Sequence, residues 1–299
     1  MDGSSAPLVA GLELGGTKCV CTLARGNEIV AQQTVPTTLP HETLPAIEGV
    51  LDGWWAEQQF EALGVASFGP VDLDPASPTY GSITATAKAG WRDANVLLPF
   101  ARKFAVPNAI DTDVNGAALS ETMWGAGRGA TDFAYITVGT GVGVGLVANG
   151  MTVHGFSHPE LGHIRIPRLA GDTWPGSCPY HGDCVEGLAS GTAIVRRLGE
   201  RDVGTVPAED PVWETVAHAI AQLCHVLVCA SAPQRIAVGG GVISKQPHLL
   251  PRIGPMLRES LAGYLHLPAG DDYVSRPGLG DSAGPLGSIA LALAALASA

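Results

Sequence analysis

Two cysteines and two histidines in the middle of the chain have the types and spacing of metal ligands. Residues 178–184 read Cys-Pro-Tyr-His-Gly-Asp-Cys, and His163 lies fifteen residues before Cys178. Thiolate sulfur and imidazole nitrogen are common ligands of tetrahedral zinc, and four protein ligands leave no open position on the ion. The sequence therefore predicts a structural zinc site formed by His163, Cys178, His181 and Cys184.

Two carboxylates flank these candidate ligands. Glu160 stands three residues before His163, and Glu186 follows Cys184 by two residues. Residues three apart share a face where the chain makes a helical turn. A metal that only organises polar groups would hold both carboxylates rigidly, so we expect a site that binds a ligand with many hydroxyl groups.

Three short glycine-rich turns each follow a predicted strand. Glycine lets the backbone come close to a ligand, and its amides can bind phosphate oxygens. A single turn of this kind is more often an ordinary hairpin, and none of the three matches the P-loop or the dinucleotide-binding fingerprint. Their repetition, with hydroxyl donors from two threonines, predicts a phosphate site at Gly15, Gly16, Thr17, Lys18, Gly139, Thr140, Gly141, Gly239, Gly240 and Gly241.

Asp113 stands where a strand over 109–112 passes into a helix that begins at Val114. A carboxylate at this place feels the helix N-terminus, which stabilises its anionic form. An anionic carboxylate can accept a proton from a hydroxyl group, so Asp113 is the candidate general base. Its alternative role is that of a helix N-cap. Asp111 is a second candidate base, but strand alternation places its side chain on the opposite face.

The elements that must carry these residues alternate between strands and helices. Residues 8–24 and 133–148 both read as strand, glycine turn and strand, so one hairpin occurs twice. This alternation predicts an α/β fold with two related lobes that share a crevice. Strands are expected at 65–68, 109–112 and 235–238, helices at 45–63, 114–124, 186–198, 211–230 and 286–299, and a long loop or β-excursion at 71–95.

Composition limits the partners. The chain is 46% hydrophobic and 15% charged, with a net charge of −11, which is typical of a compact globular protein. The acidic charge disfavours nucleic acid and anionic membranes, which reward clustered lysine and arginine. The sequence contains no run of 18 apolar residues, so it predicts no membrane span. Six cysteines in a chain of 299 residues, and a start without the features of a signal peptide, predict a cytoplasmic location.

These motifs resemble those of the ROK family of sugar kinases. Residues 11–18, Gly-Leu-Glu-Leu-Gly-Gly-Thr-Lys, are similar to the first phosphate motif of that family, and 138–141 to the second. Residues 112–121 resemble its catalytic segment, and 239–243 its adenosine motif. His-Pro-Glu-Leu-Gly-His at 158–163, followed by 178–187, matches its zinc signature. The resemblance runs from about residue 8 to the end of the chain.

The resemblance implies a two-lobed actin-like ATPase (ribonuclease H-like) fold with a central ligand cleft. The first lobe is expected over 1–115, completed by the C-terminal helix 284–299, and the second over 116–283 with the zinc loop. The implied ligands are ATP, Mg²⁺, a hexose and a structural Zn²⁺. The resemblance also implies a homodimer.

The resemblance assigns a role to each candidate residue. Asp113 becomes the general base, and the implied contacts to sugar hydroxyls come from Thr112, Glu160, His163 and Glu186. The glycine turns, with Thr17, Lys18 and Thr140, become the nucleotide site. Glu13 stands where the first phosphate motif usually has Asp, and it is implied to hold Mg²⁺ through water.

Several departures from the common family pattern resemble its fructokinase branch. They are Thr112 in place of Asn before the base, His181 in place of a third zinc-loop Cys, Glu13, and the segments 67–70 and 80–91. We therefore expect ATP-dependent phosphorylation of fructose at O6, with glucose or mannose as the alternative substrate.

Two other classes of function are weighed against this one. A sugar-responsive repressor of the same family would carry an N-terminal helix-turn-helix, for which the hairpin starting near residue 8 leaves no room. A zinc knuckle that docks a protein or nucleic acid would favour lysine, arginine and aromatic residues around the metal. The loop instead offers Asp183, Glu186 and a single aromatic, Tyr180.

Overall fold

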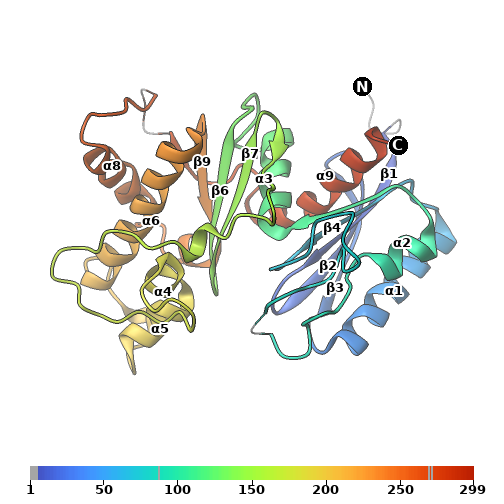
Figure 1. Cartoon of the computed structure of the whole chain (residues 1–299), viewed down its shortest axis with the longest axis horizontal. Coiled ribbons are helices and arrows are strands. Elements are labelled where there is room, and N and C mark those ends of the chain that lie inside the picture. The colour runs from blue at the N-terminus through green and yellow to red at the C-terminus, as the bar shows by residue number, and fades with distance from the viewer. Residues whose placement is uncertain (1–5, 87, 269, 271) are drawn as a thin grey trace. The chain divides into compact units, whose positions relative to one another are not determined.

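The structure, a computed structural model, describes residues 6–86, 88–268, 270 and 272–299 (Figure 1). The chain divides into two compact units. Unit 1 comprises Met1–Arg128, Thr152–Pro159 and Asp281–Ala299, and unit 2 comprises Gly129–Met151 and Glu160–Gly280. Each unit is built around its own β-sheet.

The sheet of unit 1 combines a three-stranded meander with two parallel strands. Its order is β3-β2-β1-β4-β5, in which β1 pairs with β2 and β2 with β3 antiparallel, while β4 is parallel to both β1 and β5. The strands are β1 (Leu8–Leu14), β2 (Lys18–Arg25), β3 (Glu28–Pro36), β4 (Leu63–Ser67) and β5 (Asn108–Thr112). The first glycine turn is therefore the hairpin between β1 and β2.

Alternation along β1 separates the hydrophobic core from the functional face. Leu8, Leu12 and Leu14 belong to a buried cluster with residues of the α1 side, because successive side chains of a strand point to opposite faces. On the other face, Gly11 and Glu13 lie against α9 (Ala283–Ala297). The sequence of β1 thus places a carboxylate at the end of a strand whose other face is wholly apolar.

Helices cover the sheet of unit 1. α1 (Pro40–Glu57) contacts β2 and β3, whereas α9 packs against β1, β4 and β5 (Figure 1). α3 (Asp113–Trp124) packs against α9. The approach is close, because a Cβ atom on Gly287 would lie 2.5 Å from the Gly116 carbonyl carbon. A short helix, α2 (Leu98–Phe104), precedes β5.

The sheet of unit 2 repeats the topology of unit 1. Its order is β10-β9-β6-β7-β8, with β6 antiparallel to β7 and β9 parallel to both β6 and β10. The strands are β6 (Phe133–Val138), β7 (Val142–Ala148), β8 (Met151–Thr152), β9 (Arg235–Gly239) and β10 (Val274–Ser275). The equivalent strand orders confirm that the repeated hairpin marks a repeated fold.

α6 (Pro211–Ser231) is the buried helix of unit 2. It contacts α4 (Val185–Ala189), α5 (Gly191–Leu198) and α8 (Leu250–Leu261), and Trp213 on it is fully buried. α7 (Gly241–Lys245) begins at the last residue of the third glycine turn. A 3₁₀ turn, Leu161–His163, contacts β7 and α4, which brings the first metal-ligand candidate next to the sheet.

The structure corrects two of the expected helices. The helix expected at 45–63 starts at Pro40, where proline suits the first helical turn, and ends at Glu57. The single helix expected at 186–198 is wrong. Ser190 interrupts it with an extended conformation, and its hydroxyl accepts a hydrogen bond from the Ala193 N–H, which makes Ser190 the N-cap of α5.

The boundary between the units also differs from the expected one at residue 115. Residues 116–128 stay in unit 1 because α3 packs against α9. Residues 152–159 also belong to unit 1, although the chain on both sides of them belongs to unit 2.

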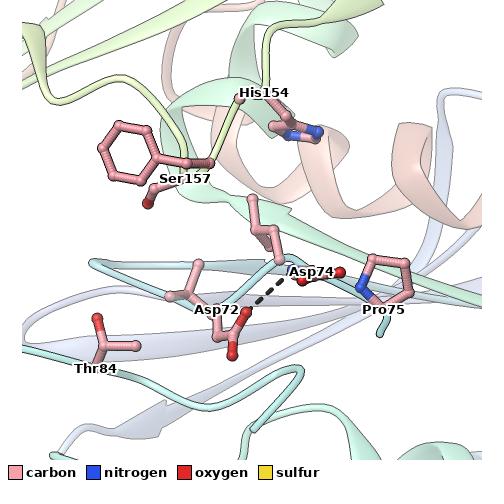
Figure 2. A pocket seen from close by; sticks show the side chains of 10 residues that line it. Asp72, Asp74, Pro75, Thr84, His154 and Ser157 are labelled. Atoms are coloured by element: carbon pink, nitrogen blue, oxygen red, sulfur yellow. Dashed lines mark hydrogen bonds between the residues drawn. The ribbon is translucent and has the colours of Figure 1, made fainter. Parts of the chain in front are cut away.

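The segment expected as a β-excursion at 71–95 contains isolated β-bridges, Val71 with Ile83 and Ser82 with Asn95. Trp91 anchors the segment, because its ring is buried and its Nε1 donates to the Thr38 carbonyl oxygen at 2.8 Å. A cavity of about 540 Å³ lies beside this segment within unit 1 (Figure 2). Its lining comes from Val71–Pro75, Thr84 and residues 154–157.

Two stretches are long and apolar enough to cross a membrane by composition, Pro211–Ser231 and Gly280–Ala297. Of an apolar 18-residue window in each stretch, 72% and 50% are buried inside the fold. The first is the core helix of unit 2, and the second contains α9, which covers the sheet of unit 1.

We expect Gly287→Ala to destabilise the protein by about 1–3 kcal/mol, because the added methyl group would be forced into the backbone of α3. Gly53→Ala is the matched control. Its Cβ would meet nothing within 4 Å in the middle of α1, so we expect a gain of about 0.5–1 kcal/mol from helix propensity. Denaturant unfolding of both variants measures the difference. Equal stabilisation by both would contradict the close α3–α9 contact.

Candidate metal centre and active site

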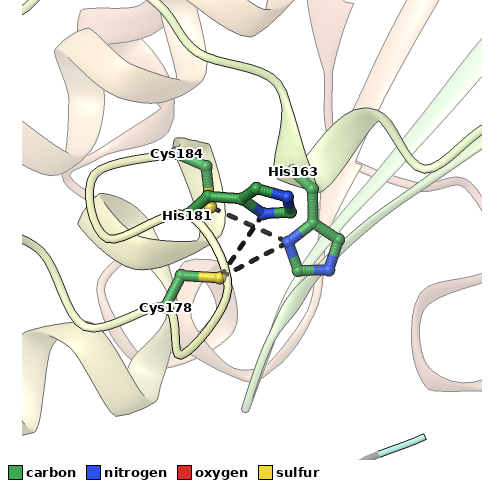
Figure 3. Close-up of side chains that lie close together, drawn as sticks. All are labelled: His163, Cys178, His181 and Cys184. Atoms are coloured by element: carbon green, nitrogen blue, oxygen red, sulfur yellow. Dashed lines mark hydrogen bonds between the residues drawn. The ribbon is translucent and has the colours of Figure 1, made fainter. Parts of the chain in front are cut away.

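The four predicted metal ligands come together in unit 2 (Figure 3). His163 Nδ1 lies 3.6 Å from Cys178 Sγ and 3.7 Å from Cys184 Sγ, and His181 Nδ1 lies 3.7 Å from Cys178 Sγ. A tetrahedral zinc ion, about 2.3 Å from sulfur and about 2.0 Å from nitrogen, separates such ligand pairs by about 3.6 Å. The donor set and its spacing therefore fit a closed zinc site.

Backbone hydrogen bonds shape the loop that carries three of these ligands. Cys178 and Gly182 exchange N–H···O bonds of 3.1 and 3.0 Å, which close the turn around His181. The Val185 N–H donates to the Ile164 carbonyl oxygen at 3.1 Å and joins the loop to the segment of His163. Burial raises the pKa of the Cys184 thiol to about 11, so metal binding at neutral pH would displace a proton.

An ion-pair network holds the chain that leads into the loop. Asp172 binds Arg197 of α5 at 2.8 Å and Arg168 at 3.0 Å, and Arg168 also binds Asp183 of the loop at 3.0 Å. Burial alone would raise the pKa of Asp172, but hydrogen bonds from Arg197, the Trp174 N–H and Arg168 hold that pKa at about 2. The Asp172 side chain is 4% exposed, so this pair is shielded from solvent screening.

The predicted sugar-binding residues of unit 2 lie beside the metal ligands. His163 presents Nδ1 to the cysteines, and its Nε2 lies 4.0 Å from Glu186 Oε1. Glu186 Oε2 accepts a hydrogen bond of 3.1 Å from the Val142 N–H, just after the second glycine turn. Burial, followed by the charge of Glu186, raises the pKa of Glu160 to about 7. The two carboxylates are thus near enough to repel each other.

Each of the three glycine turns contains a glycine that the fold's own packing does not require. A Cβ atom on Gly16, Gly139 or Gly241 would meet no protein atom within 4 Å. This open space permits a ligand to approach the backbone. The remaining turn glycines serve the fold, since a Cβ on Gly141 would lie 2.5 Å from Glu186 Oε2, and Gly240 has a φ of +90°.

Asp113 is the first residue of α3, and Thr112 is the N-cap. The Thr112 hydroxyl oxygen accepts a hydrogen bond of 3.1 Å from the Asn115 N–H. The alternative that Asp113 caps the helix is therefore wrong, because the residue before it does so. The Asp113 side chain is half-buried at the positive end of the helix, where an anionic carboxylate is favoured.

The rival carboxylate, Asp111, is buried and engaged. Its Oδ1 accepts from the Thr112 N–H at 2.7 Å and from Asn115 Nδ2 at 2.9 Å, and its Oδ2 accepts from His154 Nε2 at 2.9 Å. A carboxylate occupied by three donors is a poor candidate for taking a proton from a ligand. Asp113, whose Oδ1 accepts from the Val114 N–H at 2.9 Å, therefore stays the candidate base.

Glu13 is half-buried against the first turn of α9. A Cβ at position 284 would lie 2.1 Å from Glu13 Oε1, so a larger residue there would displace the Glu13 carboxylate. Burial raises the pKa of Glu13, and the charge of Lys18 opposes this effect. A carboxylate oxygen is a ligand type that Mg²⁺ prefers, so Glu13, beside the first glycine turn, is the residue there that could hold the ion through water.

Sequence reasoning missed Lys88, His154 and His158. The Lys88 ammonium group donates to the Gly16 carbonyl oxygen, which adds a cation to the first glycine turn. His154 binds Asp111, and His158 Nε2 accepts from the Val71 N–H at 3.1 Å. All three partners are distant in the sequence, so no local spacing could have indicated them.

The ion-pair network around Asp172 should make the free energy of unfolding depend on pH. We expect Asp172→Asn to lower the free energy of unfolding at pH 7 by about 1–3 kcal/mol, since both arginines lose a charged partner. Because the folded-state pKa of about 2 lies below the ordinary 3.8, this stabilisation is present above about pH 4 and lost as the pH falls toward 2.

Urea unfolding between pH 7 and pH 2 measures this difference. Asp52→Asn, which removes an exposed ion pair with Lys103, is the control and should change stability by less than about 0.5 kcal/mol. A difference between Asp172→Asn and the parent protein that stays constant down to pH 2 would contradict the assignment.

Comparison with known proteins agrees with this arrangement. The family model described as "ROK family" matches residues 9–295. The chain is 40% identical to a fructokinase from Pediococcus pentosaceus, over 98% of this chain and 100% of that one. It is 42% identical to a fructokinase from Zymomonas mobilis, over 95% of this chain and 96% of that one.

Solved structures show the same fold. A ROK hexokinase from Thermus thermophilus superposes with a TM-score of 0.81 at 26% identity, over 98% of this chain and 100% of that one. A ROK family glucokinase from Streptomyces griseus, in complex with glucose and AMPPNP, gives a TM-score of 0.76 at 25% identity, over 96% and 99%. The repeated α/β topology is thus the two-lobed actin-like ATPase fold, and the chain belongs to the ROK family of sugar kinases.

Proposed function

We propose that this chain transfers the γ-phosphoryl group of ATP to O6 of fructose. The proposal rests on the arrangement of His163 and Glu186 in unit 2. His163 Nδ1 faces Cys178, and its Nε2 lies 4.0 Å from Glu186 Oε1. Glu186 also accepts a hydrogen bond from the Val142 N–H, beside the second glycine turn. Such an arrangement can hold sugar hydroxyls next to a phosphate-binding turn. The similarity to fructokinases over nearly the whole chain supports fructose as the sugar.

In this mechanism Asp113 accepts the proton of the attacking hydroxyl group as the new P–O bond forms. Glu160, His163 and Glu186 accept and donate hydrogen bonds to the sugar and orient its O6. The Thr112 hydroxyl oxygen is occupied by the Asn115 N–H, but its proton stays available to donate to the sugar. Catalysis then rests mainly on positioning and charge neutralisation.

ATP would bind through the three glycine turns. The open backbone at Gly16, Gly139 and Gly241 would approach the phosphates and the adenosine, and Thr17, Thr140 and Lys18 would add donors. Mg²⁺ supplies charge neutralisation on the phosphates when bound, and Glu13 would hold it through water. Lys88 places a further positive charge at the first turn.

Zinc would be structural. His163, Cys178, His181 and Cys184 fill all four positions of a tetrahedral ion, so no position remains for a reactive water. Its contribution is to fix the orientation of His163 and of the loop before α4, which carries Glu186.

We further propose a cytoplasmic homodimer. All six cysteines are free of disulfide bonds, as expected in a reducing compartment.

Glucose or mannose remains the alternative substrate, because hydrogen bonds to a few hydroxyl groups decide between hexoses.

A coupled assay of ADP release against fructose, glucose, mannose and N-acetylmannosamine tests the proposed substrate. We expect kcat/KM for fructose to exceed that for each other hexose by at least about tenfold, as a site built to pair specific hydroxyl groups rejects analogues that leave them unpaired. A preference for glucose would move the chain to the alternative substrate, and the absence of sugar-dependent ADP release would overturn the kinase proposal.

Asp113→Asn should lower kcat by about 10²–10⁴-fold, because the amide keeps the shape of the side chain but cannot take the proton. KM for ATP should change little. The surface variant Asp52→Asn should keep parental kcat. If Asp113→Asn retains more than half of the parental kcat, another residue is the base.

Removal of zinc should lower both thermal stability and sugar binding, since ligand binding to a structural site couples to folding. We expect Cys178→Ser to purify with less zinc, to melt at a lower temperature and to show a raised KM for fructose. His181→Cys is the matched control, because cysteine is also a tetrahedral zinc ligand. Full zinc loading and a parental KM in Cys178→Ser would show that this residue is not a ligand.

A further inference from the structure

One short segment of the chain belongs to unit 1, although the residues on both sides of it belong to unit 2. Residues 129–151 and 160–280 form unit 2, but Thr152–Pro159 between them belongs to unit 1. The next residue after this segment is Glu160, and His163 follows three residues later. Contacts that hold this segment in unit 1 therefore also restrain the residues just before the proposed sugar-binding residues.

Two histidines fasten it. His154 Nε2 donates to Asp111 Oδ2 at 2.9 Å, and the Val71 N–H donates to His158 Nε2 at 3.1 Å. His158 is buried, whereas the His154 side chain is 40% exposed and lies on the cavity of unit 1 (Figure 2). Both contacts join residues more than forty positions apart in the sequence.

Asp111 connects the segment to the start of α3. While Oδ2 binds His154, Oδ1 binds the Thr112 N–H at 2.7 Å and Asn115 Nδ2 at 2.9 Å. These two donors lie on either side of Asp113 in the sequence. One buried carboxylate therefore sets both the first turn that carries the proposed base and the segment that leads to the proposed sugar site.

The surroundings explain why Asp111 needs His154. Asp111 is almost fully buried, and a buried carboxylate needs a compensating partner. Titratable groups that feel the charge of Asp111 include His154, His158 and Tyr80. The pKa of His154 is raised by its hydrogen bond to Asp111, whereas burial lowers the pKa of His158 and raises that of Tyr80. His154 thus supplies the hydrogen bond that Asp111 Oδ2 accepts.

We propose that Asp111 and His154 form a positioning pair for phosphoryl transfer. The pair, which rests on the proposed function, touches neither sugar nor nucleotide. Through its hydrogen bonds, the pair fixes the helix turn that carries Asp113 and the segment that precedes Glu160 and His163. Loss of His154 leaves Asp111 short of a donor, so the turn of Thr112–Asn115 relaxes, and a shift of about 1 Å at a catalytic group can cost about 10²-fold in rate.

Steady-state kinetics of two His154 variants test this role. His154→Leu removes the donor, and we expect kcat/KM for fructose to fall by at least about tenfold while KM for ATP stays within about twofold. His154→Gln keeps a neutral N–H donor near the position of Nε2 and should recover most of the loss. His218→Gln is the control, since His218 lies in unit 2, where its Nε2 hydrogen-bonds to the Pro167 carbonyl oxygen, and it should behave as the parent.

A double-mutant cycle with Asp111→Asn tests the connection directly. If the pair acts as one unit, His154→Leu should add less than about twofold to the loss caused by Asp111→Asn. Independent, multiplicative losses would overturn the pairing. Equal rises in KM for ATP and fructose, or no rescue by His154→Gln, would mean a merely structural role. These results require a parent protein that phosphorylates fructose, whereas an inactive parent would contradict the proposed function instead.

Discussion

The arrangement of unit 2 depends on one constraint, the convergence of two sulfur and two nitrogen atoms from separate chain segments. All four ligand atoms lie within 4.8 Å of one another, a spacing that fits a shared tetrahedral ion. This convergence orients His163, joins its segment to the loop before α4, and so sets Glu186 beside the second glycine turn. The proposed sugar site is a consequence of how the metal-type cluster is built.

In unit 1, close helix packing and hydrogen bonds hold the proposed base in place. Glycines at 116 and 287 let α3 and α9 approach to backbone contact, and glycine at 284 makes room for Glu13. Thr112 caps α3, and buried Asp111 binds the same turn. The half-buried Asp113 therefore lies at a helix start whose neighbouring residues are held in place. Catalysis by positioning requires a base with a fixed position.

The sequence predicted the features that rest on local spacing. The two hairpins, the Cys-His cluster and the start of α3 were recognisable because periodicity and ligand spacing are short-range signals. The break at Ser190 was missed because the apolar pattern continues across it. The Asp111–His154 contact and the Lys88–Gly16 contact join residues that only the tertiary fold brings together. For the same reason the sequence did not indicate that residues 152–159 belong to unit 1.

Zinc K-edge X-ray absorption on the purified protein, combined with metal analysis, tests whether the Cys-His cluster holds a structural zinc ion. We expect one zinc ion per chain with two sulfur ligands at about 2.3 Å and two nitrogen ligands at about 2.0 Å. We also expect these distances to stay unchanged when fructose is added, because the ion has no open position. Zinc bound mainly by oxygen, a coordination shell that gains a ligand with the sugar, or full sugar phosphorylation by protein free of zinc would contradict the structural zinc site.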